Sequence, residues 1–151
     1  MKRKVEWTGR MARGFTLAEL MVVIVIIGLL ATLVVPNVVS KIFTAKVGIA
    51  KAQVMNLYSA IKDYQTRNGG KLPESLEALV TPDANGVTYL EDATSVPLDP
   101  WDNEYFYKPD QNQITCEVGT YGSDGQPGGE GDAADISNKT LANERGSKAN
   151  R

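Results

Sequence analysis

The chain has 151 residues, no histidine and one cysteine, so its length allows one modest globular domain. Its formal net charge of −2 combines a leader, residues 1–14, of net charge +4 with a remainder that carries 11 basic and 17 acidic side chains. These values exclude an internal disulfide, a Cys–His nucleophile and a zinc cluster, and the acidic bulk argues against nucleic-acid binding.

An uncharged apolar run follows the basic leader and extends from Leu20 to Val35. Counted from Phe15, the 21 residues to Val35 would form a helix of about 31 Å at about 1.5 Å per residue, which matches the hydrocarbon core of a bilayer. The basic leader should stay in the cytoplasm, which places the C-terminal bulk outside the membrane. We therefore predict a transmembrane helix over residues 15–36, with Pro36 expected to kink or locally unwind it.

Two other interpretations fit a basic and then apolar N-terminus. A secretory signal peptide would have a shorter apolar region that ends in small residues, whereas here only Ala31 lies near the end of the run. An uncleaved signal anchor is the second alternative. The apolar run alone leaves both open.

The segment Gly14 to Glu19, with the sequence G-F-T-L-A-E, lies at the cytoplasmic edge of the apolar run. It resembles the signal of the type IV pilin superfamily, in which a prepilin peptidase cuts after glycine and methylates the new N-terminal phenylalanine. The resemblance implies cleavage after Gly14 and N-methylation of Phe15. Gly14 fits a protease groove because it has no side chain to obstruct it.

Glu19 places a carboxylate within the first turn of the apolar helix. The resemblance implies that it pairs with the α-amino group of Phe15 on a neighbouring subunit of a filament. Such a pair would be satisfied only in the correct register, so it would act mainly as a specificity device. A glutamate that reaches the lipid headgroups is the alternative.

The extramembrane part is predicted to be α+β. Apolar residues recur at helical spacing between residues 41 and 68, and Gly69 and Gly70 should stop that helix. A short helix is expected at 72–80, then strands at 104–107 and 114–118 joined by a turn at 109–112. Cys116 is expected to be a small, partly buried strand residue.

These segments resemble the major pseudopilin family of type II secretion. The resemblance covers residues 10–136 and is carried by the turn between Gly69 and Pro73, the run 76–80 and the block 99–105, D-P-W-D-N-E-Y. Asp102 replaces the usual glycine of that block, and aspartate tolerates turn conformations. The family implies a pilin-like fold, in which a long N-terminal helix packs on a small antiparallel sheet, with residues 37–136 as a periplasmic domain.

The loop from Tyr121 to Ile136 contains four carboxylates and five glycines. Carboxylates this close repel one another unless a cation joins them, and calcium accepts six to eight oxygen ligands in flexible geometry. The residues alone leave a calcium site and a solvated acidic loop both open. The resemblance implies calcium, with ligands at the Tyr121 carbonyl, Asp124, Asp132 and Asp135, and with the Gln126 carbonyl and Glu130 as possible additions.

The tail, residues 137–151, is polar and without periodicity, so we expect it to be disordered. The family usually has Asn-Trp directly after the acidic loop, whereas this chain has Asn138 and Lys139. What closes the metal loop is therefore left open.

The expected function is structural: a subunit that polymerises into the periplasmic pseudopilus of a type II secretion system and assists export of folded proteins. The resemblance implies self-assembly, minor pseudopilins, an inner-membrane assembly platform and a prepilin peptidase as partners, with a single-pass location in the inner membrane. A type IV pilin for adhesion, motility or DNA uptake is the alternative, against which the lack of a cysteine pair argues. An enzyme is not expected, since the chain has no histidine and no recognisable nucleophile, and it lacks an ATP-binding P-loop.

Overall fold

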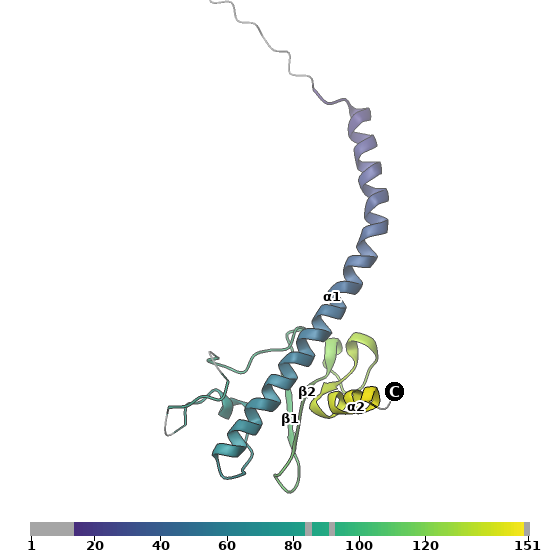
Figure 1. The fold of residues 1–151 in the computed structure, drawn as a ribbon. Helices are drawn as coiled ribbons and strands as arrows, with labels where there is room; N and C mark the ends of the chain where they lie inside the picture. Colours follow the sequence, from purple (N-terminus) through teal and green to yellow (C-terminus); the bar gives the residue numbers. More distant parts are fainter. Residues whose placement is uncertain (1–13, 84–85, 91–92, 150–151) are drawn as a thin grey trace, which may run out of the picture. The chain divides into compact units, whose positions relative to one another are not determined.

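The computed structural model describes residues 14–83, 86–90 and 93–149 (Figure 1). In chain order its elements are α1 (Leu17–Arg67), the 3-10 helix η1 (Leu76–Leu79), β1 (Phe106–Pro109), β2 (Cys116–Thr120), the 3-10 turns η2 (Gly122–Asp124) and η3 (Gly131–Ala133), β3 (Ile136–Ser137) and α2 (Asn138–Ala149). The chain divides into two units, one up to Ser40 and one from Lys41 onward.

The first unit consists of the N-terminal part of α1. The side chains of its large apolar residues from Leu17 to Val35 are all exposed, and α1 is the one helix in the described ranges that is long and apolar enough to cross a membrane. The helix runs through Pro36 without a break, so the predicted local unwinding does not occur. A proline removes only one backbone donor, so a continuous helix can pass through it.

The second unit has its own hydrophobic core. One face of α1 buries side chains at helical spacing, and they pack against residues from β2, β3 and α2 and from the segment 72–90; the helix contributes Ala50, Val54, Leu57, Ala60 and Ile61. α1 ends at Arg67, as the glycine pair predicts. Gly69 and Gly70 have φ values of 65° and 86°, and the Gly70 N–H donates to the Gln65 carbonyl at 2.8 Å, which closes the last turn.

The sheet is antiparallel in the order β1-β2-β3, so the α+β prediction is confirmed. Phe106 pairs with Gly119, and Thr120 pairs with Ile136. Both predicted strands begin two residues too early. Glu104 and Tyr105 lie between a turn that begins at Asp99 and the start of β1, and a bond from the Asp110 N–H to the Thr115 carbonyl at 2.8 Å closes a wider hairpin loop.

The predicted helix at 72–80 is shorter than expected. Only Leu76–Leu79 is helical, as one 3-10 turn, and it buries Leu76 and Leu79 in the core. Burial of these two leucines is enough to anchor a single turn. It therefore fixes the position of η1 in the core without requiring a longer helix.

The predicted disorder of the tail is wrong for residues 137–149, which complete β3 and form α2. Ser137 caps the helix: its N–H donates to the Thr140 hydroxyl at 2.8 Å, and its own hydroxyl accepts the Thr140 N–H at 3.2 Å. Leu141 is buried in the core, and Lys51 of α1 forms an ion pair with Glu144 at 2.8 Å. Long-range contacts therefore order a segment whose own sequence carries little helical signal.

Candidate functional site

The start of α1 holds the residues predicted for processing and assembly. Gly14 and Phe15 lie before the helix and belong to no helix or strand; a Cβ at Gly14 would meet no atom within 4 Å, and Phe15 is 85% exposed. A side chain at Gly14 would thus meet no neighbouring atom of the described residues.

Glu19 does not point away from its own chain. Its carboxylate accepts the Thr16 N–H and the Thr16 hydroxyl, both at 2.9 Å, while the Thr16 hydroxyl accepts the Glu19 N–H at 3.2 Å. This reciprocal pattern is a capping box, which satisfies free donors at the first turn of a helix. It was not predicted, although the spacing T-x-x-E signals it in the sequence. Glu19 therefore fixes the point at which α1 begins, two residues after Phe15.

The acidic loop begins after β2 and returns to the sheet as β3, with its two ends held by the pairing of Thr120 with Ile136. η2 and η3 lie against each other inside it. Gly122 has a φ of 75°, and a Cβ there would lie 2.7 Å from the Asp132 carbonyl oxygen. Only glycine permits this approach of the two backbone segments.

The four predicted ligand residues are all on this loop, but their side chains do not converge. Asp124 accepts the Gln126 N–H at 3.1 Å, and both carboxylate oxygens of Asp135 accept the Gly128 N–H at 3.0 Å. No group of three or more acidic side chains within the described ranges is placed to hold a metal ion. The structure therefore does not bring Asp124, Asp132 and Asp135 into one set of ligands.

The donor chemistry of the loop nevertheless suits calcium. Carboxylates and backbone carbonyls are the hard oxygen ligands that calcium prefers, and glycine-rich backbone can turn its carbonyls inward. The Asp135 carboxylate would exchange its bond to Gly128 for the cation. The residues fit the ion in kind.

Tyr121 contributes a ring as well as the predicted carbonyl. Its ring stacks on Phe106 with centroids 4.6 Å apart, and the Lys108 Nζ lies 5.3 Å from its centroid. The pKa of Lys108 is raised, chiefly by a hydrogen bond with Tyr121, while Glu117 and Asp135 add smaller favourable interactions. A cation of the protein thus already lies near one side of the acidic loop.

The residues before β1 fasten the start of the acidic loop, and this contact was not predicted. Asp99 is only 4% exposed, and its Oδ1 accepts the N–H groups of Trp101 at 2.9 Å and Asn103 at 2.8 Å. Its Oδ2 accepts a short hydrogen bond from the Thr120 hydroxyl, which in turn accepts the Gly122 N–H at 3.1 Å. A chain of bonds therefore joins the D-P-W-D-N turn to the first residues of the loop.

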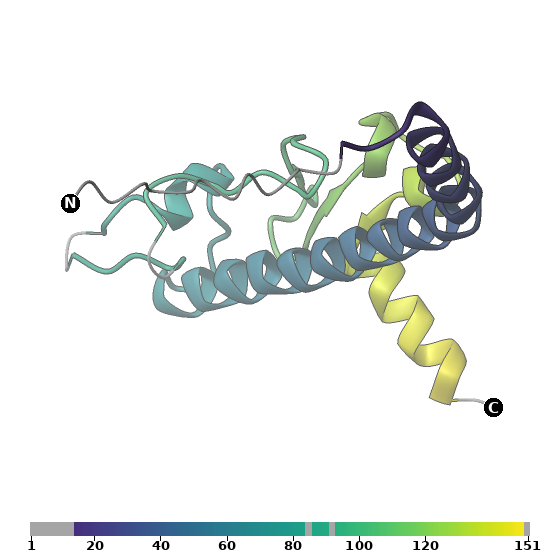
Figure 2. The ribbon, with the colours of Figure 1, turned by 90° about the horizontal axis from the view of Figure 1, so that it is seen from above.

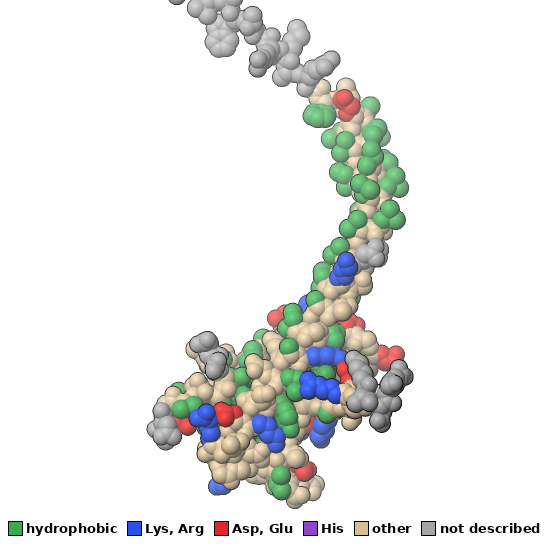
Figure 3. Space-filling view, in the orientation of Figure 1, with side chains coloured by type: hydrophobic (Ala, Val, Ile, Leu, Met, Phe, Trp, Pro, Cys, Tyr) green, Lys and Arg blue, Asp and Glu red, His purple; other side chains and the backbone are tan. Residues whose placement is uncertain are grey.

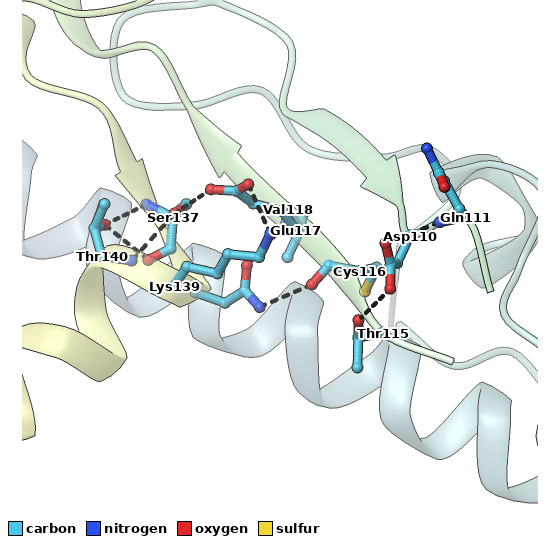
Figure 4. Close-up of polar contacts among 10 residues, drawn as sticks. Asp110, Gln111, Thr115, Cys116, Glu117, Val118, Ser137, Lys139 and Thr140 are labelled. Carbon is cyan, nitrogen blue, oxygen red and sulfur yellow. Dashed lines mark hydrogen bonds and ion pairs between the residues drawn. The ribbon is translucent and has the colours of Figure 1, made fainter. Parts of the chain in front are cut away.

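The end of the loop is closed by the residues that follow it (Figure 4). The Asn138 side chain accepts the Val118 N–H at 2.9 Å and donates to the Cys116 carbonyl at 3.1 Å, which extends the pairing beyond β3. Glu117 accepts the Ser137 hydroxyl at 2.8 Å and pairs with Lys139 at 3.2 Å. The Asn138 side chain thus closes the end of the loop in this chain, through its two bonds to β2.

Comparisons with known proteins agree over nearly the whole chain. The family described as type II secretion system protein G matches residues 37–139, and the prokaryotic N-terminal methylation motif matches residues 9–35. Type II secretion system core protein G of Vibrio cholerae is 41% identical over 138 residues, covering 87% of this chain and 94% of that protein. The protein of the same name from Pseudomonas aeruginosa is 38% identical over 136 residues, covering 85% and 96%.

A solved structure is similar as well. The crystal structure of the major pseudopilin from the type 2 secretion system of enterohaemorrhagic Escherichia coli superposes with a TM-score of 0.52 at 26% identity. The match covers 71% of this chain and 97% of that chain. The likeness therefore extends over almost all of the solved molecule.

Proposed function

This chain belongs to the type II secretion system protein G family and is a structural subunit of the pseudopilus, and from that premise we propose how its residues serve assembly. The peptidase of the methylation motif cuts after Gly14 and methylates Phe15. The mature subunit is anchored in the inner membrane by the first part of α1, with the unit from Lys41 onward in the periplasm. It then polymerises through α1, together with minor pseudopilins and an inner-membrane assembly platform.

One observation carries this proposal: the apolar side chains of α1 from Leu17 to Val35 are all exposed. Exposed apolar surface of this extent requires lipid or other protein around it. A bilayer satisfies it before assembly, and the same helices of neighbouring subunits satisfy it afterwards. The role is structural and needs no catalytic group.

Deleting the gene should abolish secretion of exported proteins and leave pilus-driven motility intact; the reverse result would favour an adhesion or motility pilin.

Glu19 is proposed to serve twice. In the uncut chain its carboxylate caps α1 through Thr16. After cleavage the new α-amino group lies on Phe15, one residue before Thr16, and carries a positive charge at neutral pH, since α-amino groups have a pKa of about 7.7–8.0. A neighbouring subunit in register then supplies a carboxylate to that amine, which reduces the cost of burying either charge alone.

Three variants separate the cap from the charge. Glu19→Ala removes both, Glu19→Gln keeps a capping side chain without the charge, and Thr16→Ala weakens the cap while keeping the carboxylate. We expect Glu19→Gln to assemble as poorly as Glu19→Ala, Thr16→Ala to form filaments, and all three to be cut after Gly14. Electron microscopy of sheared filaments and mass spectrometry of the membrane form measure these outcomes. Abundant normal filaments from Glu19→Gln would contradict the charge-pairing role.

Calcium is proposed as the ion of the acidic loop, held by the carboxylates of Asp124, Asp132 and Asp135 and by the Tyr121 carbonyl, with further oxygens from Gln126 and Glu130. Both ends of the loop are already fixed, at one end by Asp99 and Thr120 and at the other by the residues around Asn138. The ion would neutralise repelling carboxylates and hold the middle of the loop. It would do so in a domain that has no disulfide.

The calcium proposal predicts a change in thermal stability. An ion that binds only the folded state raises the melting temperature by mass action, so chelation should lower it and added calcium should restore it. Asp124→Asn and Asp135→Asn should weaken this dependence, whereas Asp110→Asn, on the β1–β2 hairpin, should leave it unchanged. The assay is thermal unfolding followed by circular dichroism, with elemental analysis of the purified protein. Equal melting curves with calcium and with chelator, and no bound metal, would remove the proposal.

A further inference from the structure

The second unit carries a groove between α1 and α2. Its volume is about 590 Å³, and its walls include Met55 and Tyr58 of α1 and Ala142 and Arg145 of α2. Lys51 and Leu141 line a smaller hollow, of about 420 Å³, that lies beside it and shares Met55 and Arg145. The stems of these side chains are mostly apolar, so the groove offers an apolar floor with charged groups at its rim.

The charge at this rim is positive on balance, because Lys51 pairs with Glu144 and Lys139 pairs with Glu117, which leaves Arg145 in excess. The Lys62 Nζ lies 5.6 Å from the centroid of the Tyr58 ring, and Lys139 is at the rim, where Glu117 pairs with it. Arg145 is exposed and forms no ion pair with any acidic side chain of the part of the chain that the structure describes. Figure 3 shows lysine and arginine side chains gathered over this part of α1 and beside α2. The groove therefore suits an acidic partner with an apolar projection.

A surface with those properties occurs elsewhere on the same unit. Leu98 is 49% exposed and lines a hollow of about 390 Å³ together with the exposed side chains of Glu77 and Glu104. No lysine or arginine is among the described residues that line it. The surface thus combines an exposed leucine with two carboxylates, which match the basic, apolar groove in charge and polarity.

The two surfaces lie on opposite sides of the α1 segment that begins at Lys41. In both Figure 1 and Figure 2, the chain from η1 to Leu98 runs along one side of this segment, and α2 lies on the other. One molecule therefore cannot bring its own two surfaces together. Two molecules that join groove to acidic surface keep one of each free, so the contact can repeat from copy to copy, as a head-to-tail contact does in a filament.

We propose that adjacent copies of this chain in the pseudopilus join in this way, an inference that rests on the proposed polymerisation. Leu98 of one copy enters the groove between α1 and α2 of the next, and Glu104 and Glu77 face Arg145 and Lys139. The apolar contact excludes water, while the charges fix orientation and reject wrong registers. Since α2 supplies one wall of the groove, the C-terminal helix is part of the assembly surface.

A charge-reversal cycle in the full-length chain tests the contact. Arg145→Glu and Glu104→Arg each place like charges opposite one another and should each reduce the amount of filament about tenfold or more. The double variant restores opposite charges and should recover most of the filament. Lys71→Glu is the matched control, because Lys71 is exposed and lines neither surface, and it should assemble normally. Circular dichroism checks that every variant is folded.

Cysteine cross-linking gives a second measurement. Cys116 is only 3% exposed but lines the groove, so Cys116 is replaced by serine in every cross-linking variant. The double variant Leu98→Cys with Ala142→Cys should give a ladder of covalent oligomers on mild oxidation of filaments. Lys71→Cys with Ala142→Cys should not.

The two assays separate this contact from polymerisation itself. Absence of filaments from the wild-type chain would refute the proposed polymerisation. Two results would overturn only the proposed contact, provided that the wild-type chain forms filaments. One is that filaments of the Leu98→Cys, Ala142→Cys variant give no ladder, and the other is that the double charge variant does not recover assembly.

Discussion

Asp102 shows how one side chain can stand in a position suited to glycine. Its φ is 69°, in the left-handed region that costs most residues about 1–2 kcal/mol, and its N–H donates to the Asp99 carbonyl at 3.0 Å within the turn. Aspartate tolerates this conformation better than most residues. The positive φ at this position thus explains why glycine is expected there from the resemblance to pseudopilins.

Replacing Asp102 by glycine should therefore stabilise the domain. Glycine removes the steric cost of the positive φ but adds freedom to the unfolded chain, so we expect Asp102→Gly to raise the free energy of unfolding by about 0.5–1 kcal/mol. Denaturant unfolding of the purified protein measures the change. Asp102→Ala serves as the control, and it should not be stabilising because alanine keeps the Cβ. A destabilised Asp102→Gly variant would show that the aspartate side chain itself has a favourable role.

Asp99 lies in the same turn, and its role was beyond the reach of the sequence. Resemblance identified the block 99–105, but a carboxylate in a polar turn is ordinarily exposed. The partner that buries it, Thr120, lies 21 residues further along the chain, and only the sheet brings the two together. Glu19 is the contrasting case, because its capping box with Thr16 is local and could have been read directly from T-x-x-E.

The junction between β2 and α2 depends on one carboxylate. Burial tends to raise the pKa of Glu117, but hydrogen bonds from Ser137 and Lys139 and the nearby positive charges outweigh it, so its pKa is lowered from an ordinary value of 4.5. The folded state thus favours the ionised form. The stability that this carboxylate contributes is present above pH 4.5 and is lost as the pH falls through its lower, folded-state pKa.

We expect Glu117→Gln to lower stability at neutral pH and to reduce the loss of stability between pH 5 and pH 3, about the range in which such a carboxylate titrates. Thermal unfolding of both proteins across that range checks the prediction. Glu104→Gln is the matched control, since Glu104 is exposed, and its pH dependence should follow the unmodified protein. Parallel curves for Glu117→Gln and the unmodified protein would contradict a linked role for this group.

Elements differed in how far their sequences specify them. The second half of α1 was predictable because its apolar period and the terminal glycines are local signals. The starts of β1 and β2 were not, since alternation does not say where pairing begins. α2 was missed because, of its residues whose burial is described, Leu141 alone is buried in the core, and the helix is held by a cap at Ser137 and by the contacts of Asn138 with β2.

The molecule as a whole divides at Ser40. Among the described residues, every buried core residue lies at Ala50 or later, within the second unit. A chain that begins at Lys41 should therefore fold and remain soluble without detergent, with circular dichroism showing cooperative unfolding and size-exclusion chromatography a single compact species. A fragment that is unfolded or aggregated would mean that the first part of α1 is needed for the core.

At the scale of the whole molecule, the family, the α+β class and the long N-terminal helix could be predicted from the sequence, because each rests on motifs or periodicity. The sequence could not establish the calcium site. The loop's carboxylates and glycines are compatible with a solvated loop and with a metal site alike, and the described arrangement leaves Asp124 and Asp135 bonded to backbone N–H groups. The positions of the ligand oxygens depend on the bound cation as well as on the sequence.

The exposed apolar stretch of α1 also bears on whether transfer of a subunit from the membrane into a filament is favourable. Lipid tails are about as apolar as leucine, so moving this stretch from a bilayer into a bundle of like helices involves little net hydrophobic gain or loss. The exchange is therefore close to balanced, and packing and paired charges decide which way it goes. Under the proposed polymerisation, hydrophobic transfer alone would therefore not drive a fibre of this kind to grow, and its growth would depend on subunit packing, paired charges or an external drive.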